Sequence, residues 1–259
     1  MQVALLCGGL GTRLNEETVS KPKPMVEIGE KPMLWHLMRY YRHFGHSDFV
    51  LCTGYKGHLI KDYFINYKYN ASDILVDMAK GNVTLLDEPQ ADMDWTVTIQ
   101  DTGIPTQTGS RLKQALKHLK DDVFMATYGD GLCDVDLDRL LAHHNASGKL
   151  ATVTAVRPSS RFGELGLHGD SVTSFEEKPQ TGKGWINGGF FVFSRSIFED
   201  LPDDDTITLE AGVLQPLARE GHLSVYRHDG FWQCMDTLRE KQLLDQYWRD
   251  DRAPWKIWR

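Results

Sequence analysis

The sequence predicts an α/β fold built on a largely parallel sheet, and three observations support this prediction. Strand-like runs alternate with helix-like runs through the first half of the chain, which is typical of parallel strands joined by crossover helices. The chain has 259 residues, 41% of them hydrophobic, which is enough to bury a substantial core. It contains no internal repeat and no low-complexity linker, so we expect a single domain over residues 1–259.

The expected elements begin with a strand from Val3 to Cys7. A glycine-rich loop follows, and then a helix that starts at Pro32, where helices tolerate proline, and ends near Gly45. Residues 66–100 carry the weakest pattern. The other elements of the first half are a strand at 49–52, a helix around 60–64, short strands at 83–86 and 96–99, a helix at 111–119, a strand at 123–127, a helix at 137–144 and a strand at 151–156.

After residue 156 the pattern changes to hairpin-like runs at 165–176 and an apolar stretch at 190–193, followed by helices at 209–219 and 237–249. This change predicts two lobes within the one domain. The first lobe covers residues 1–149 and the second covers residues 150–236. A C-terminal helix and tail complete the chain from residue 237 to residue 259.

The glycine-rich loop reads Gly-Gly-Leu-Gly-Thr-Arg over residues 8–13 and directly follows the first strand. Glycine lets the backbone approach a ligand closely and turn several N–H groups towards one point, as a polyphosphate requires. Arg13 and Lys23 add cationic side chains on either side. The segment matches neither the P-loop nor the Gly-x-Gly-x-x-Gly fingerprint. The sequence therefore predicts a phosphate cradle of another kind.

Two aspartates are candidate ligands of a divalent cation. Asp130 lies in Gly-Asp-Gly after the strand at 123–127, and ligands of open α/β sheets bind beyond the carboxyl ends of such strands. Asp236 precedes the helix at 237–249. Magnesium that is held on substrate phosphates needs only one or two protein carboxylates. The alternatives are that Asp130 bonds its own backbone in a turn and that Asp236 caps the helix beginning at Leu238.

Composition excludes several other classes. The net charge of -7 argues against nucleic acid as a partner, because binding a phosphate backbone needs a basic surface. The four cysteines form no Cys-x-x-Cys pair, so neither a zinc site nor a disulfide framework is expected. The sequence has no signal-peptide pattern and no long apolar stretch, so we expect a cytoplasmic protein without a membrane partner.

These motifs, with Glu-Glu-Lys-Pro at 176–179 and Asn-Gly-Gly at 187–189, resemble the sugar-1-phosphate nucleotidyltransferases, and most specifically the glucose-1-phosphate cytidylyltransferases. The resemblance runs from Met1 to the Ala-Pro-Trp-Lys tail. It implies a Rossmann-like, mostly parallel mixed sheet flanked by helices, with an added sugar-binding lobe. It also implies formation of CDP-glucose and pyrophosphate from CTP and glucose 1-phosphate, with Mg²⁺, for surface polysaccharide precursors such as O-antigen.

The same resemblance assigns site residues. It implies catalytic roles for Arg13, Lys23 and Asp130 and magnesium binding by Asp130 and Asp236. The sugar-phosphate site matches Glu177, Lys178, Asn187 and Gly188. The nucleotide site matches Leu6, Cys7, Gly8, Gly9, Leu10, Gly11, Thr12, Arg13, Lys23, Thr106, Arg111 and Gly129. Relatives commonly have alanine at position 7 and a Glu-Pro-Leu pattern near residues 209–212, so the chain departs from the family there.

Base selection has one candidate residue. Cytosine presents acceptors at O2 and N3, whereas uracil and thymine present a donor at N3, so a donor at Arg111 suits cytosine. The alternative is that Arg111 opens a helix and points to solvent. Two other functions stay open: the same fold acting on UTP, dTTP or GTP or on another sugar 1-phosphate, and a non-catalytic nucleotide-binding domain.

The tail suggests self-association. Trp248, Trp255 and Trp258 are three of the seven tryptophans, and tryptophan is enriched at buried interfaces. Members of the resembled family commonly associate, so we expect a homo-oligomer whose truncation after Arg252 separates the subunits without unfolding them. The alternative is that the tail folds back and completes the core of its own subunit.

Overall fold

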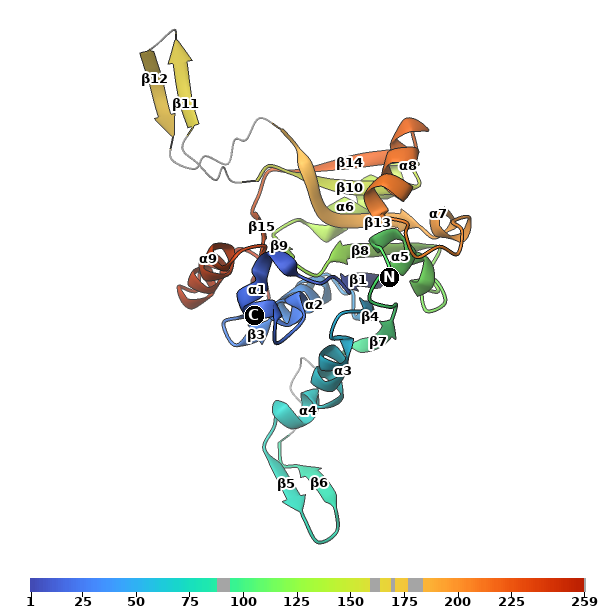
Figure 1. Cartoon of the computed structure of the whole chain (residues 1–259), viewed down its shortest axis with the longest axis vertical. Helices are drawn as coiled ribbons and strands as arrows, with labels where there is room; N and C mark the ends of the chain where they lie inside the picture. Colours follow the sequence, from blue (N-terminus) through green and yellow to red (C-terminus); the bar gives the residue numbers. More distant parts are fainter. Residues whose placement is uncertain (88–93, 159–163, 169–170, 177–183, 259) are drawn as a thin grey trace.

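A seven-stranded sheet forms the centre of the computed structural model, which describes residues 1–87, 94–158, 164–168, 171–176 and 184–258. Strand β13 runs antiparallel to both of its neighbours, and the other pairs are parallel (Figure 1). The sheet is therefore mixed and mostly parallel, as predicted. In spatial order the strands are β14 (Leu223–His228), β10 (Ala151–Val156), β13 (Ile186–Ser194), β8 (Val123–Tyr128), β1 (Gln2–Cys7), β4 (Asp48–Thr53) and β7 (Thr96–Asp101).

Helices cover both faces of this sheet because its central strands are apolar on both sides. Alternate residues of a strand point to opposite faces, so Val3 and Leu5 of β1 enter one core and Ala4 and Leu6 enter the other. The first core also contains residues of α2 (Met33–His43), α3 (Gly57–Ile65), α6 (Leu137–Ser147) and α9 (Leu238–Arg249). The second contains residues of α5 (Thr108–Ala115), α7 (Ser196–Glu199), α8 (Gln215–Arg219) and the π-helical turn Glu210–Leu214.

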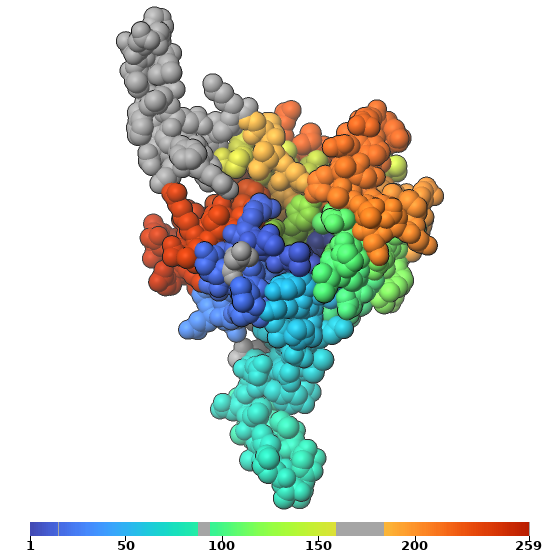
Figure 2. Space-filling model, in the orientation of Figure 1, coloured from blue at the N-terminus to red at the C-terminus, as the bar shows by residue number. Residues whose placement is uncertain are grey.

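Smaller elements surround the sheet. A short antiparallel ribbon joins β9 (Gly131–Cys133) to β15 (Trp232–Cys234). The hairpin β5 (Ile74–Asp77) and β6 (Asn82–Leu85) projects from one end of the molecule, as Figure 2 shows. The remaining elements are the 3-10 turns Thr12–Leu14 and Lys23–Met25, α1 (Asn15–Thr18), α4 (Tyr67–Asn70), and the hairpins β2 (Glu27–Ile28) with β3 (Lys31–Pro32) and β11 (Glu164–His168) with β12 (Ser171–Glu176).

Most of the predicted elements are confirmed, and a few of their bounds differ. The strand predicted at 151–156 coincides with β10. Helix α5 begins and ends earlier than predicted, at Thr108 and Ala115. The helix predicted at 209–219 is divided into the π-helical turn and α8. Over the described part of the chain, no helix is long and apolar enough to cross a membrane.

The C-terminal tail folds back on its own subunit. Trp255 is fully buried, donates its indole N–H to His36 Nδ1 at 3.3 Å and stacks on Phe231 with ring centres 5.6 Å apart. Trp258 packs edge-on against Trp35. The alternative stated for the tail is therefore confirmed. Because Trp255 is a core side chain, we now expect truncation after Arg252 to destabilise the fold.

Candidate active site

A pocket of about 520 Å³ opens at the carboxyl ends of β1 and β8. All the residues predicted for nucleotide binding line it, and so does Asp130. The sequence did not single out the other residues that line it. They are Pro24, Ile104, Pro105, Gln107, Thr108 and Tyr128. The available signals were that Pro24 follows Lys23 directly and that Tyr128 precedes the Gly-Asp-Gly motif.

The glycine loop forms one wall of this pocket. Gly11 adopts a positive φ of 65°, a conformation that glycine adopts without strain. A Cβ atom there would lie only 2.9 Å from the methyl group of Thr18. The Thr18 hydroxyl donates to the Gly11 carbonyl oxygen at 3.0 Å, and this bond stabilises the conformation of the glycine loop. At Gly8 a Cβ atom would overlap the Arg111 guanidinium at 2.2 Å, so this position also requires glycine.

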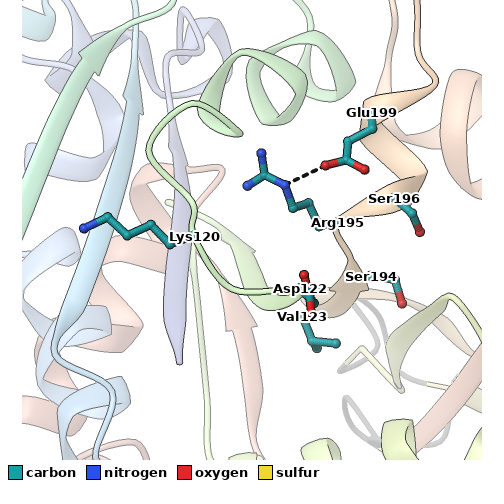
Figure 3. A pocket seen from close by; sticks show the side chains of 7 residues that line it. All are labelled: Lys120, Asp122, Val123, Ser194, Arg195, Ser196 and Glu199. Atoms are coloured by element: carbon teal, nitrogen blue, oxygen red, sulfur yellow. Dashed lines mark hydrogen bonds and ion pairs between the residues drawn. The ribbon is translucent and has the colours of Figure 1, made fainter.

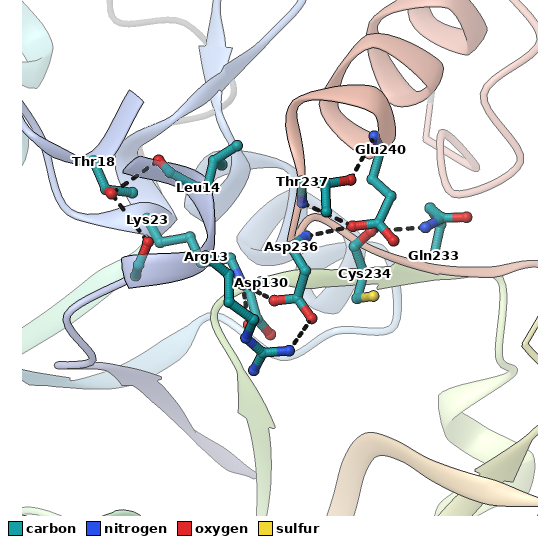
Figure 4. Close-up of polar contacts among 11 residues, drawn as sticks. Arg13, Leu14, Thr18, Lys23, Asp130, Gln233, Cys234, Asp236, Thr237 and Glu240 are labelled. Carbon is teal, nitrogen blue, oxygen red and sulfur yellow. Dashed lines mark hydrogen bonds and ion pairs between the residues drawn. The ribbon is translucent and has the colours of Figure 1, made fainter. Parts of the chain in front are cut away.

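The β9–β15 ribbon brings the two candidate aspartates together. Asp130 immediately precedes β9, and Asp236 lies two residues after β15. The ribbon pairs Gly131 with Cys234, and the Met235 N–H donates to the Asp130 carbonyl oxygen at 2.8 Å. Two carboxylates that are far apart in sequence therefore lie close together beside Lys23 (Figure 4). Asp130 lines the pocket, whereas Asp236 is not among the residues that line it.

Lys23 lies between these carboxylates. Its ammonium group donates to Asp130 Oδ2 at 2.7 Å and to Asp236 Oδ1 at 2.5 Å. Arg13 donates to the other oxygen of Asp236 at 2.6 Å. Burial alone would lower the pKa of Lys23, but the charges and hydrogen bonds of the two aspartates outweigh burial and raise that pKa above 10.5. The ammonium group is therefore charged at neutral pH.

The two alternative roles of the aspartates are not supported. The cap of α9 is Thr237, which accepts from the backbone N–H of Glu240 in a reciprocal capping box. Glu240 in turn accepts the backbone N–H of Asp236 at 2.7 Å. Because the cap belongs to the next residue, the carboxylate of Asp236 is not needed for capping and pairs instead with Lys23 and Arg13. Asp130 likewise directs an oxygen to Lys23 and not to an amide of its own turn.

The residues present fit a magnesium ion that arrives on substrate phosphates. In the described ranges, no group of three or more His, Cys, Asp and Glu side chains is arranged to hold a metal ion. One or two carboxylates are enough for magnesium when phosphate oxygens complete its shell. Asp130 and Asp236 offer two, and the Lys23 ammonium marks a position between them that attracts positive charge.

Arg111 does not point to solvent, so that alternative is wrong. Its residue is only 3% exposed, and its guanidinium donates to the carbonyl oxygens of Thr53, Gly8 and Ile104 at 2.9, 3.2 and 3.3 Å. It also donates to the Thr102 hydroxyl. Arg111 thus links the glycine loop to the last residue of β4 and to the loop that follows β7, while its side chain still lines the pocket.

Of the four residues predicted to bind the sugar phosphate, the structure describes Asn187 and Gly188. Asn187 is exposed and Gly188 is buried at the start of β13. Gly188 accepts the indole N–H of Trp232 at 2.7 Å. Nearby, Tyr128 donates its hydroxyl to Glu210, and burial followed by this bond raises the Tyr128 pKa. Glu177 and Lys178 lie outside the described residues.

A second cavity, of about 350 Å³, lies near the amino end of β8 (Figure 3). Arg195 lines this cavity, and its guanidinium pairs with Glu199 at 2.7 Å and donates to the Leu116 and Leu119 carbonyl oxygens. These contacts stabilise the fold. We assign no chemistry to this cavity. Its walls are Lys120, Asp122, Val123, Ser194, Arg195, Ser196 and Glu199.

Comparison with known proteins defines the class to which this pocket belongs. Residues 3–250 match the nucleotidyl transferase family, and the chain belongs to that family. HddC from Yersinia pseudotuberculosis has the same fold, with a TM-score of 0.71, 25% identity and coverage of 95% of this chain and 99% of that one. UDP-glucose pyrophosphorylase, at 15% identity, shares the fold with a TM-score of 0.68 over 97% and 99% of the two chains.

Within the family, full-length similarity is found to glucose-1-phosphate cytidylyltransferases. The chain is 48% identical to the glucose-1-phosphate cytidylyltransferase of Salmonella typhimurium over 259 residues, which covers both chains completely. It is 40% identical over 258 residues to the probable glucose-1-phosphate cytidylyltransferase of Bacillus subtilis, again with complete coverage of both.

Proposed function

We propose that this chain is an enzyme that transfers the cytidylyl group of CTP to glucose 1-phosphate and forms CDP-glucose and pyrophosphate. The observation that carries the proposal is the convergence of the glycine loop, Arg13, Lys23 and Asp130 on one pocket, with Asp236 paired to both Arg13 and Lys23. Similarity over the full length to glucose-1-phosphate cytidylyltransferases supports the choice of substrates.

The chemistry follows from charge. Both substrates are polyanions that repel each other, so the pocket must neutralise them before the sugar phosphate can attack the α-phosphate. Arg13 has a side chain that is 76% exposed, so it can turn from Asp236 to the departing pyrophosphate. Lys23 is largely buried but lines the pocket, so its ammonium group can contact the nucleotide phosphates there. A magnesium ion held by Asp130 and Asp236 would supply further charge neutralisation at the phosphates.

No side chain has to act as a nucleophile or a general base. The attacking phosphate oxygen of glucose 1-phosphate is already ionised near neutral pH, so the protein contributes orientation and electrostatic stabilisation. The backbone N–H groups of the glycine loop supply part of this stabilisation because the loop faces the pocket. Turnover therefore depends on how closely the two phosphates are aligned.

Base selection by Arg111 is part of the proposal. A guanidinium donor suits the O2 and N3 acceptors of cytosine. For this role, Arg111 would exchange one of its present bonds, such as the 3.3 Å bond to the Ile104 carbonyl oxygen, for a bond to the base. The wrong base would leave a buried donor unpaired, which is the usual source of strong discrimination.

We also propose that residues 1–149 bind mainly nucleotide and that residues 150–236 bind mainly sugar phosphate.

We further propose that the chain forms homo-oligomers in the cytoplasm, where CTP is present. The projecting β5–β6 hairpin supports self-association, because an isolated two-stranded hairpin is marginally stable in water and exposed apolar clusters mark interfaces. Six large hydrophobic side chains are exposed on or beside it: Ile74, Leu75, Val76, Met78, Val83 and Leu86.

Light scattering tests the assembly. We expect Leu75→Lys to lower the mass in solution, whereas Val225→Lys, which changes an exposed residue of β14, should leave it unchanged. A wild-type chain that is monomeric at micromolar concentration would contradict the proposal.

A panel of nucleotides tests the reaction. Wild-type protein is incubated with Mg²⁺, glucose 1-phosphate and CTP, UTP, dTTP or GTP, and pyrophosphate release is measured while mass spectrometry identifies the product. We expect CDP-glucose, with CTP preferred by at least about tenfold. Equal or better use of UTP or dTTP would show that the base assignment is wrong. Nucleotide binding without turnover of any triphosphate would favour a non-catalytic domain.

A further inference from the structure

Trp232 connects the β9–β15 ribbon to the central sheet. It belongs to β15 and pairs with Cys133 at one end of the ribbon, whereas Asp130 and Asp236 both lie at the opposite end, beside the Gly131–Cys234 pair. Its indole N–H donates at 2.7 Å to the carbonyl oxygen of Gly188, which lies on β13 in the central sheet. The bond therefore joins the ribbon that positions the two carboxylates to the strand that carries Asn187.

The place where this bond ends is a β-bulge. The register between β13 and β10 shifts, so that Ala155 pairs with Asn187 while Val153 pairs with Phe191. Gly188 and Gly189 thus fall outside the regular pairing, and bulges of this kind direct side chains next to active sites. Their carbonyl oxygens accept from side chains instead: Gly188 from Trp232 and Gly189 from the Thr127 hydroxyl at 2.7 Å.

The bulge has little freedom to adjust by itself. A Cβ atom at Gly188 would lie 2.7 Å from a methyl group of Val156, and one at Gly189 would lie 2.6 Å from the Tyr128 ring. Asn187 accepts the N–H of Gly189 at 2.9 Å, so its side chain follows the conformation of the bulge. Asn187 itself is exposed and is able to contact a ligand.

We propose that Trp232 is a positioning residue that aligns glucose 1-phosphate with the α-phosphate of CTP by fixing the Asn187–Gly189 bulge relative to Asp130 and Asp236. This inference rests on the proposed function. Reactions between two bound groups depend steeply on their mutual position, so loss of the link reduces turnover of the sugar phosphate more than binding of the nucleotide. The glycine loop, which holds CTP, is attached to other elements and is unaffected.

The test removes one N–H group. Trp232→Phe should lower kcat/KM for glucose 1-phosphate by about tenfold, the effect of one lost hydrogen bond, while KM for CTP stays within about twofold of the wild type. Replacement of Trp232 by 3-benzothienylalanine, which keeps the ring shape and has sulfur in place of N–H, should give the same result and excludes a packing defect as its cause.

Trp35→Phe is the matched control. It also removes an indole N–H bond, here to the Tyr67 hydroxyl at 2.9 Å, and we expect unchanged kinetic constants. Unchanged kinetics in both Trp232 variants, an equal rise in KM for CTP, or an equal loss in Trp35→Phe would overturn the inference. If the wild-type protein itself makes no CDP-glucose, the proposed function fails instead, so the two failures are distinguishable.

Discussion

Replacing Lys23 by methionine would remove the positive charge that lies between Asp130 and Asp236. One carboxylate oxygen of each aspartate lies within 2.7 Å of Lys23 Nζ. Without the ammonium group, the two negative charges face each other. At a separation of about 5 Å and an effective dielectric constant of about 20, they repel by about 3 kcal/mol. This dielectric constant is suitable because the Asp130 side chain is 35% exposed. Arg13 contacts Asp236 at 2.6 Å through a side chain that is 76% exposed, so it offsets only part of this repulsion.

Added magnesium should reverse the effect. In EDTA at pH 7 we expect the Lys23→Met protein to unfold roughly 6 °C below the wild type, since about 3 kcal/mol shifts the midpoint of a chain of this size by at least that amount. Magnesium at about 10 mM should restore most of the difference, because the ion replaces the ammonium between two carboxylates. Magnesium should change the thermal unfolding midpoint of the wild-type protein much less. Turnover of CTP should be lost by orders of magnitude in either condition.

Thermal unfolding followed by circular dichroism provides the measurement, and Lys21→Met is its control. Lys21 pairs with Glu27 at 3.0 Å in a more exposed setting, where an ion pair contributes about 0–1 kcal/mol. The control should therefore unfold near the wild-type temperature and show no magnesium dependence of its own. A Lys23→Met protein as stable as the wild type in EDTA, or equal stabilisation of both proteins by magnesium, would refute the electrostatic account.

Three further predictions concern separate parts of the molecule. Asp236→Asn should lower turnover by at least about 100-fold and lower the thermal midpoint less than Lys23→Met does, because Thr237 supplies the helix cap and Lys23 keeps its pair with Asp130; near-normal activity would exclude a role in catalysis. Burial lowers the pKa of His36 from 6.5 to about 4, so it stays neutral in the folded state and takes up a proton on unfolding below pH 6.5. Urea titrations should then show that stability falls by about 3 kcal/mol more in wild type than in His36→Gln as pH drops from 7 to 4, and identical pH dependences would contradict this. Truncation after Arg252 removes the buried Trp255 and should cost about 4 kcal/mol of unfolding free energy; an unchanged urea midpoint would show that the tail is not part of the core.

The sequence alone was enough to predict the fold class and the glycine loop at the pocket, because both depend on local patterns. Alternating apolar runs indicate whether a segment packs as a strand or a helix. The three glycines of the loop indicate a backbone that can approach a ligand closely, and the loop does line the pocket. The same reasoning placed Asp130 correctly at the pocket, because it follows a buried strand at the edge where ligands bind.

Tertiary structure decided the points that depend on neighbours distant in sequence. Whether Asp236 caps a helix or pairs with Lys23 and Arg13 is decided by Thr237 and Glu240, together with a ribbon only three residues long, and no periodicity predicts so short a ribbon. Whether Arg111 is solvated or buried depends on carbonyl oxygens that three separate segments of the chain direct towards it. Trp255 is apolar enough for an interface or a core, and the contacts with His36 and Phe231 place it in the core. In each case the residue type permits two environments, and only the packing of the whole chain selects one.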